Sequence, residues 1–350
     1  MHIDLNLSRK KKFFMSLTIT EKHTISVIIC AYALERWHDL VAAVTSVQNQ
    51  TVQAAEIIVV IDHNPELFLR AQEQLTGIVV IENSEERGLS GARNSGILRT
   101  SSDLLVFLDD DAMADVLWLE QLSQSMHDPD ILGTGGTVLP YWVDQKPSWL
   151  PEEFYWVVGC TYLGLPLTIA SVRNPIGASM CIRREVFEAV GGFRSGIGRV
   201  GTRPVGCEET ELCIRARQHW SQRTFLFIPQ AQVSHRVPGQ RTHWHYFWTR
   251  CYAEGISKAF VARFVGAKDS LSAESSYTLQ TLPKGVLRNL NAAIFHHDSA
   301  GLARAGAIIA GLLITTAGYL VGRCFSKPTE SASHAMNIPL VEGALNEQVW

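Results

Sequence analysis

The segment DLLVFLDDDA, residues 103–112, joins a strand-like apolar run to three consecutive acidic residues. The apolar run stops abruptly at Asp109, Asp110 and Asp111. Neighbouring carboxylates oppose one another's ionisation, so such a cluster needs either water or a cation around it. A surface turn would provide water, and Asp is common at strand ends. A binding site would provide a divalent cation, which prefers hard oxygen ligands.

Apolar runs of strand length also precede this segment, and stretches with helical spacing separate them. The runs are ISVIICAY (25–32), EIIVVID (56–62) and GIVVIE (77–82), and the helical stretches cover residues 35–50, 65–75 and 91–98. Strands that alternate with helices pair in parallel, with helices on both faces of the sheet. Ligands of such sheets bind beyond the carboxyl ends of the strands. Asp62 and Asp109 both end strands, so we expect them on one rim.

The composition is that of a folded protein without a strong charge bias. Hydrophobic residues make up 46% and charged residues 19% of the 350 residues, which excludes general disorder. The formal net charge is −3, so nucleic acid is not expected as a partner. The seven cysteines form no Cys-x-x-Cys pair, which argues against zinc or a disulfide framework and favours a reducing cytosol.

The first residues, 1–24, are expected to form a basic leader rather than a secretory signal. Arg9 to Lys12 precedes only three apolar residues, too few for the core of a signal peptide. Phe13 and Phe14 beside these charges would suit an anionic membrane surface. The alternative is a frayed leader upstream of a true start at Met15.

Three regions of the second half carry further signals. Residues 140–166 are rich in aromatic residues and proline, which predicts a folded loop region that either packs over the sheet or binds an acceptor. Residues 174–193 predict a strand, a helix from about Arg184 and a Gly-Gly turn. Residues 228–237 predict a strand that ends in His235, which is either structural or a metal ligand.

Two motifs contain candidate chemistry of their own. GCEETELCIRAR (206–217) places Glu208, Glu209 and Glu211 at the start of a predicted helix. These acids either complement the helix dipole or include a general base that the turn aims into a cleft. GLSGARNSGI (88–97) lacks the glycine spacing of dinucleotide-binding loops, yet its Arg93 and helix N-terminus could face a diphosphate.

In this order the motifs resemble an inverting family-two glycosyltransferase with the GT-A fold, over about residues 25–265. The motifs that carry the resemblance are VIICAY with VVID, GLSGARNSGI, FLDDDA, GASMCIRREVFEAVGGF, and GCEETELCIRAR followed by VSH. The expected fold is therefore α/β, with a Rossmann-like, mixed but mainly parallel sheet and helices on both faces. An apolar C-terminal helix is expected to follow this domain.

The resemblance also implies roles at the donor site. In this family an Asp-x-Asp motif binds the ribose and a Mg²⁺ or Mn²⁺ ion that the sugar-nucleotide diphosphate holds. Asp109 and Asp111 match that motif, with Asp111 as the principal metal ligand and Asp110 as part of the same donor-binding rim. His235 matches a histidine that approaches the metal and the diphosphate.

Further roles follow from the other matches. Asp62 matches the residue that recognises the donor base, and Arg93 one near the donor phosphates. Glu208 and Glu209 match an acidic pair whose second member is the catalytic base, although Glu209 stands where Asp is usual. His63 follows Asp62 where an acid or Asn is common.

The segment Ala305 to Gly322 contains 18 residues without a charge. At ~1.5 Å per residue such a helix spans roughly 27 Å, just short of a bilayer core. It is either a single membrane span or a buried helix. Its small-residue patterns, Gly318-x-x-x-Gly322 and Gly306-x-x-x-Ala310, suit helix pairing and a possible homodimer.

The expected layout is a catalytic domain (25–265), a linker with juxtamembrane helices (266–304), a transmembrane helix (305–322) and a polar tail (323–350). Basic residues are slightly more frequent before the apolar helix than after it, which favours the cytoplasmic face of the membrane for the catalytic domain.

The expected function is metal-dependent transfer of a sugar, with inversion, from a nucleotide-diphosphate sugar to an acceptor hydroxyl. The acceptor is expected to be lipid-linked or a saccharide in the assembly of cell-surface polysaccharide or glycolipid. The segment Phe247 to Cys251 lacks the Gln-x-x-Arg-Trp pattern of processive synthases, which favours single addition. The alternatives are a metal-dependent nucleotidyltransferase and a non-catalytic, membrane-bound sensor of nucleotide sugars.

Overall fold

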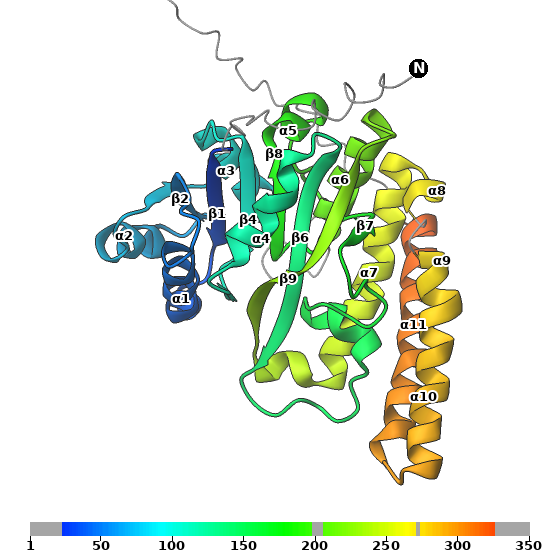
Figure 1. Cartoon of the computed structure of the whole chain (residues 1–350). Coiled ribbons are helices and arrows are strands. Elements are labelled where there is room, and N and C mark those ends of the chain that lie inside the picture. The colour runs from blue at the N-terminus through cyan, green and yellow to red at the C-terminus, as the bar shows by residue number, and fades with distance from the viewer. Residues whose placement is uncertain (1–22, 198–205, 271–273, 326–350) are drawn as a thin grey trace, which may run out of the picture.

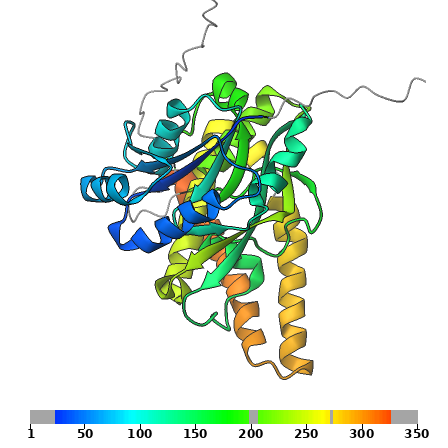
Figure 2. The ribbon, with the colours of Figure 1, turned by 60° about the vertical axis from the view of Figure 1, so that its left-hand side comes forward.

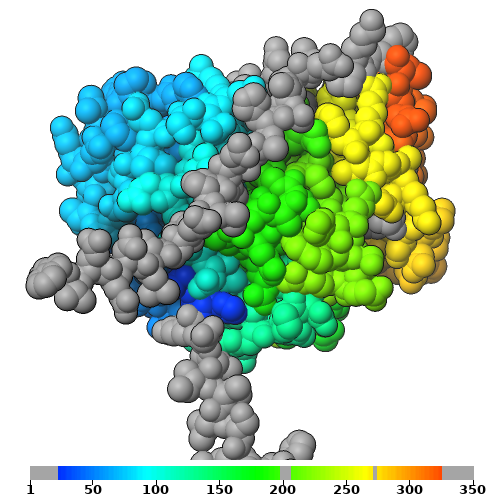
Figure 3. Space-filling model, turned by 90° about the horizontal axis from the view of Figure 1, so that it is seen from above, coloured from blue at the N-terminus to red at the C-terminus, as the bar shows by residue number. Residues whose placement is uncertain are grey.

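A computed structural model describes residues 23–197, 206–270 and 274–325 (Figure 1). The basic leader up to residue 22 and the polar tail from residue 326 lie outside the described residues. Seen from above, the N-terminal elements occupy one side of the molecule and the C-terminal helices the opposite side (Figure 3).

One mixed, nine-stranded sheet organises the molecule. Its strands are β1 (Ile25–Ala31), β2 (Glu56–Ile61), β3 (Val79–Glu82), β4 (Leu104–Asp109), β5 (Ala112–Ala114), β6 (Ile131–Trp142), β7 (Ala170–Val172), β8 (Ser179–Arg183) and β9 (Thr224–Val237). The order is β3-β2-β1-β4-β8-β6-β9-β5, and β7 pairs with β9 beside this path. The first four strands pair in parallel, as predicted, whereas β8 runs antiparallel to β4 and β6.

The helices cover both faces of this sheet because alternate strand residues point to opposite faces. Val27 and Ile29 belong to one apolar core, and Ile28 between them belongs to the other. The first core contains residues of α1 (Trp37–Gln48), α2 (Pro65–Gln74) and α4 (Trp118–Gln124). The second contains residues of α3 (Leu89–Arg99), α5 (Arg184–Val190) and α6 (Glu208–His219). The predicted α/β fold is confirmed.

Short 3₁₀ segments connect several of these elements. They are η1 (Leu34–Arg36), η2 (Ser125–His127), η3 (Glu152–Val158) and η4 (Gly239–Thr242). The aromatic region that was expected to be a folded loop therefore contains η3 as well as the end of β6. Its aromatic rings pack on one another, for example Phe154 on Trp156 with ring centroids 5.4 Å apart.

The long strand β6 was not expected from the sequence, because its segment ILGTGGTVLPYW is rich in glycine and lacks an alternating pattern. The glycines serve close strand packing. A Cβ on Gly136 would lie 1.9 Å from the carbonyl oxygen of Ala231, and one on Gly133 would lie 2.5 Å from that of Cys181. Strand β9 also runs two residues past His235, so this histidine lies inside the strand rather than at its end.

The C-terminal part forms a helical layer on the side of the sheet away from β3 (Figures 1 and 2). It contains α7 (Trp244–Val265), α8 (Ala267–Ser270), α9 (Glu274–Ser276), the π-helical turn η5 (Tyr277–Thr281), α10 (Leu282–Phe295) and α11 (Ala300–Phe325). Helices α10 and α11 form a hairpin, and α11 lies along α7.

Small residues allow α11 to approach α7 closely. A Cβ on Gly318 would lie 2.1 Å from the carbonyl oxygen of Tyr252, and one on Gly322 2.8 Å from Cβ of Ala259. The Gly318-x-x-x-Gly322 face thus pairs with a helix of the same chain, and a homodimer is not shown. Among the described residues, one helix is both long enough and apolar enough to cross a membrane, and it covers Ala300–Cys324. By itself this is weak evidence for a membrane span.

Candidate functional site

Asp109, Asp111 and His235 lie together, and strand pairing explains why. Strand β4 ends at Asp109, and after the turn β5 pairs with β9 so that Ala112 lies opposite His235. The Nε2 atom of His235 consequently lies 3.1 Å from Oδ1 of Asp111. The three side chains offer ligand atoms within 4.8 Å of one another. We call Asp109, Asp110, Asp111 and His235 the carboxylate rim.

The rim is surrounded by cations that the sequence reasoning missed. Arg36 lies 2.8 Å from Asp110 and 3.4 Å from Asp111, and Arg241 lies 3.4 Å from Asp111. Burial would raise the pKa of Asp111, but His235, Arg241 and Arg36 hold it well below its usual range. Burial raises the pKa of Asp110 to about 7 in spite of Arg36.

The donor set of the rim fits a divalent cation. Carboxylate oxygens are the ligands that Mg²⁺ and Mn²⁺ prefer, and one imidazole is compatible with Mn²⁺. Among the described residues, Oδ2 of Asp110 and Nη1 of Arg241 are buried without a hydrogen-bond partner. Buried polar atoms of this kind are rare, and they fit a site whose remaining partner is an ion or a phosphate.

Asp62 is buried at the end of β2, on the same edge of the sheet as Asp109. Its carboxylate accepts hydrogen bonds from Asn83 Nδ2 at 2.7 Å and from the backbone N–H of Gly88 at 3.0 Å. His63 Nδ1 lies 2.9 Å from it. Asp62 therefore holds the loop that opens α3, and its role in recognising a base stays a prediction.

Arg93 bridges the rim and the acidic pair of α6. It is buried, and its guanidinium lies 2.9 Å from Glu208 Oε1 and 3.5 Å from Asp109 Oδ1. It also donates to the carbonyl oxygen of Gly177 at 3.0 Å. Arg93 therefore links two parts of the site, and its role near the donor phosphates stays a prediction.

The three glutamates of α6 have different surroundings. Glu211 is fully buried and pairs with Arg215 at 2.7 Å and Arg194 at 3.2 Å, so it belongs to the structural core of this helix. Glu208 is buried against Arg93. Glu209 lines a cavity and keeps part of its surface exposed. The burial of the rest of the side chain, together with the adjacent Glu208, raises the pKa of Glu209 to about 8.

The turn before α6 is fixed from α7. Cys207 adopts a left-handed conformation with φ 73°, which is strained for a non-glycine residue and persists only where the surroundings enforce it. Here the Sγ of Cys207 donates to Glu254 at 3.4 Å, and the backbone N–H of Gly206 donates to Ser257 at 3.1 Å. Helix α7 therefore holds the turn that presents Glu209.

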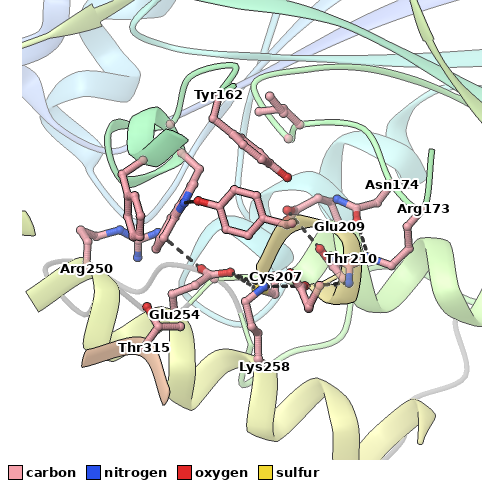
Figure 4. Close-up of a pocket in the computed structure, with 18 of the residues that line it drawn as sticks. Tyr162, Arg173, Asn174, Cys207, Glu209, Thr210, Arg250, Glu254, Lys258 and Thr315 are labelled. Carbon is pink, nitrogen blue, oxygen red and sulfur yellow. Dashed lines mark hydrogen bonds and ion pairs between the residues drawn. The ribbon is translucent and has the colours of Figure 1, made fainter. Parts of the chain in front are cut away.

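One cavity of about 400 Å³ lies beside the acidic pair of α6 (Figure 4). Its lining includes Asp109 of the carboxylate rim, Arg93, Glu208 and Glu209. The lining continues with Tyr162, Arg173, Glu254, Lys258, Glu274 and Tyr277, and then with Leu312, Thr315, Thr316 and Tyr319 of α11. Its size falls within the ~300–1,000 Å³ typical of small-molecule sites.

Comparisons with known proteins show the family of the chain. The family model described as glycosyl transferase family 2 matches residues 26–191. The chain is also 36% identical over 238 residues to a glucosyl-dolichyl phosphate glucuronosyltransferase of Haloferax volcanii, covering 67% of this chain and 76% of the relative. The chain belongs to glycosyltransferase family 2.

Two further proteins resemble the chain at lower sequence identity. A succinoglycan biosynthesis protein of Rhizobium meliloti is 22% identical, covering 76% of this chain and 87% of the relative. Among solved structures, a mannosyltransferase of Pyrobaculum calidifontis, in complex with GDP-Man and Mn²⁺, superposes with a TM-score of 0.54 at 15% identity. It covers 84% of this chain and 87% of the other, and it supports the fold alone.

The sequence indicated only weakly that Arg36 and Arg241 belong to the site of this family-2 enzyme. Arg36 follows the first strand, on the edge where ligands of a parallel sheet bind. Arg241 stands six residues after His235 in a Pro-Gly turn. Position relative to the strands could have indicated both, but an isolated surface arginine in a loop is common.

Proposed function

We propose that this glycosyltransferase is metal-dependent and inverting, and that it transfers a sugar from a nucleotide diphosphate to a hydroxyl of a lipid-linked acceptor. One observation carries the proposal: Asp109 and Glu209 line the same cavity. A leaving diphosphate beside Asp109 and a general base for the acceptor would thus face one cavity.

In this mechanism Asp111 and Asp109, with His235, hold a Mg²⁺ or Mn²⁺ ion. The bound ion supplies charge stabilisation for the departing nucleoside diphosphate. Arg36 and Arg241, which lie against these carboxylates, would offer positive charge to the donor phosphates. Asp62 contacts the donor base. Arg93 fixes the positions of the Glu208 and Asp109 carboxylates relative to each other.

Glu209 removes the proton from the acceptor hydroxyl as its oxygen attacks the anomeric carbon. The bond to the diphosphate breaks on the opposite side of that carbon, so the configuration inverts. The raised pKa of Glu209, about 8, supports this role, since a base is most effective with a pKa near the working pH. Glu208 is less suited because Arg93 holds its carboxylate.

The lipid-linked class of acceptor rests on two observations. The relative from Haloferax volcanii is named for action on a glucosyl-dolichyl phosphate. In this chain, α10 and α11 expose large apolar side chains, among them Leu287, Phe295 and Leu313, each more than 60% exposed. Exposed apolar residues gathered on neighbouring helices are typical of a membrane-interaction surface.

We place the enzyme at the cytoplasmic face of the membrane, where nucleotide sugars are available. A helix hairpin lying in the interface fits the packing better than the single span expected from the sequence. Helix α11 lies along α7, and α7 contains the charged residues Glu254 and Lys258. Carrying α7 into the hydrocarbon together with α11 would be costly.

The test uses the purified full-length protein with Mg²⁺ or Mn²⁺, a panel of nucleotide sugars and lipid-linked glycosyl phosphates. We expect metal-dependent release of nucleoside diphosphate and a product whose anomeric configuration, measured by NMR, is opposite to that of the donor. Release of pyrophosphate would identify a nucleotidyltransferase instead. Donor binding without any turnover would indicate a sensor, and retained configuration would exclude inversion.

A further inference from the structure

Besides Glu209, the cavity is lined by a tyrosine and four charged side chains, which we call the chamber: Tyr162, Arg173, Glu254, Lys258 and Glu274. Figure 4 labels all of them except Glu274. They come from the loop after η3, the segment after β7, and helices α7 and α9. The labelled side chains of Figure 4 surround one common space. No role in the transfer described above uses any of them.

The charges of the chamber compensate one another. The Nζ atom of Lys258 lies 2.7 Å from Glu274 and 3.1 Å from Glu254. Arg173 lies 2.9 Å from the same oxygen of Glu274. Burial would raise the pKa of Glu274, but Lys258 and Arg173 hold it at about 2. Two cations thus face two carboxylates in the chamber, and a third cation, Arg250, lines the cavity 3.9 Å from Glu254.

Such a lining suits a polyhydroxylated ligand better than an ion. Each sugar hydroxyl both donates and accepts a hydrogen bond, and the chamber offers carboxylate acceptors beside ammonium and guanidinium donors. A phosphate dianion would meet Glu254 and Glu274 as closely as it meets the cations. The ring of Tyr162, packed edge to face on Tyr277 at 5.4 Å, adds an apolar surface against which a pyranose can pack.

The outer end of the cavity opens on α11. Leu312, Thr315, Thr316 and Tyr319 line it, at spacings that place them on one side of the helix. Ile309, Leu313 and Leu320 form the adjoining stripe and are 50%, 63% and 57% exposed. Thr316 lies where the two stripes meet, so the polar chamber passes directly into an apolar outer surface.

We propose that the chamber binds the sugar of an acceptor whose apolar chain leaves past Thr316 along Leu313 and Leu320. The sugar lies among Tyr162, Lys258 and Glu274 and presents one hydroxyl to Glu209. This inference rests on the proposed function and specifies where its acceptor binds. It makes α11 a wall of the substrate site as well as a contact with lipid.

The test compares two tryptophan substitutions on α11. Thr316→Trp places bulk at the mouth of the cavity, whereas Ala317→Trp places the same side chain on an exposed position that does not line it. With a glucosyl phosphate on dolichol as acceptor, Thr316→Trp should raise the acceptor KM about tenfold or more. The affinity for nucleoside diphosphate, measured by calorimetry, should stay unchanged, and Ala317→Trp should match the wild type.

A second variant probes the chamber itself. Tyr162→Phe keeps the ring and removes one hydroxyl, and it should raise the acceptor KM about three- to tenfold without changing the donor KM. Tyr141→Phe, at a 55% exposed tyrosine of β6, is the matched control.

Two results would overturn the inference. One is a wild-type acceptor KM in both Thr316→Trp and Tyr162→Phe. The other is equal use of glucose 1-phosphate and its dolichol-linked form by the wild type. Failure of the proposed function looks different, because the wild type would then release no nucleoside diphosphate with any donor and acceptor.

Discussion

The two ends of the active-site cavity are both charged, but they are built in opposite ways. At the carboxylate rim the acids are consecutive residues at the end of a strand, and arginines from other elements lie against them. In the chamber the charges come from three separate parts of the chain, and every one has an opposite charge beside it. In the proposed mechanism the rim exchanges its partners when a metal ion and a phosphate enter, whereas the chamber keeps a fixed arrangement.

One of the two largest effects is expected from the rim. Asp111→Asn removes the carboxylate that three cations now surround, so metal and diphosphate binding should weaken together. We expect the rate to fall by roughly 10²–10³-fold, as is typical when a key electrostatic group is lost. Nucleoside diphosphate release and Mn²⁺ calorimetry would measure this, with Asp130→Asn at an exposed position as control. An unchanged metal affinity would remove Asp111 from the metal site.

A comparable loss of rate is expected when Glu209, which lines the cavity together with the chamber, is changed. Glu209→Gln keeps the shape of the side chain but removes the proton acceptor, so turnover should fall by roughly 10²–10⁴-fold. Nucleoside diphosphate affinity should stay at the wild-type level, because Glu209 lies outside the rim. Weakened donor binding of similar size would show that Glu209 acts at the rim instead. Glu208→Gln, by contrast, should disturb both ends because it releases Arg93.

The pH profile distinguishes the base from its neighbours. Glu209 has a pKa raised to about 8, and only its deprotonated form can accept the proton. The value of kcat/KM should therefore rise with pH and level off above about 8, and Glu209→Gln should remove this limb. A profile that is flat from about pH 6.5 to 9 in the wild type would exclude Glu209 as the base.

A smaller effect should show whether the rim exchanges partners. Arg241→Met removes one cation from Asp111, so Mn²⁺ should bind several-fold more tightly without nucleotide. Nucleoside diphosphate should bind about tenfold more weakly in the presence of Mn²⁺, because one charged contact to phosphate is lost. Arg99→Met, at a 48% exposed side chain on α3, is the control. If both affinities change in the same direction, Arg241 does not alternate between carboxylate and phosphate.

The smallest effect on catalysis concerns the outer face of α11. Leu313→Gln with Leu320→Gln should lower binding to anionic lipid vesicles about fivefold, since less apolar area enters the interface. The affinity for nucleoside diphosphate, measured by calorimetry, should stay unchanged, because neither leucine lies near the carboxylate rim. Leu69→Gln, at a 59% exposed leucine of α2, serves as control. Equal vesicle binding by all three proteins would place the membrane contact elsewhere.

The contrast between the two ends also explains what the sequence could predict. The strands β1 to β4 are continuous apolar runs that end in turns. The parallel sheet and the strand-end positions of Asp62 and Asp109 could therefore be predicted from periodicity. The Asp-x-Asp and Glu-Glu motifs are local and could be matched directly. The contact between Asp111 and His235 needed the pairing of β5 with β9, which no local pattern contains.

The chamber could not be predicted because its members are separated by up to about a hundred residues. Lys258 and Glu254 have the ordinary i, i+4 spacing of a solvated helix face, and only the packing of α9 and α11 buries them. Strand β6 was missed for a related reason, since glycines required by close packing look like turn residues. The length of α11 was underestimated because Arg304 stands inside the helix, where it bonds Asn289 and Asp298.

The close fit of Gly318 and Gly322 against α7 bears on how this enzyme can be handled as a reagent. Deleting α11 to obtain a detergent-free protein would strip one wall from the substrate site and uncover the helix that holds the Cys207 turn. A water-soluble enzyme with its activity intact has to keep every residue of α11 that faces inward. The apolar side chains that can be exchanged for polar ones are those outside the stripe of Leu313 and Leu320, such as Leu302, which is 60% exposed.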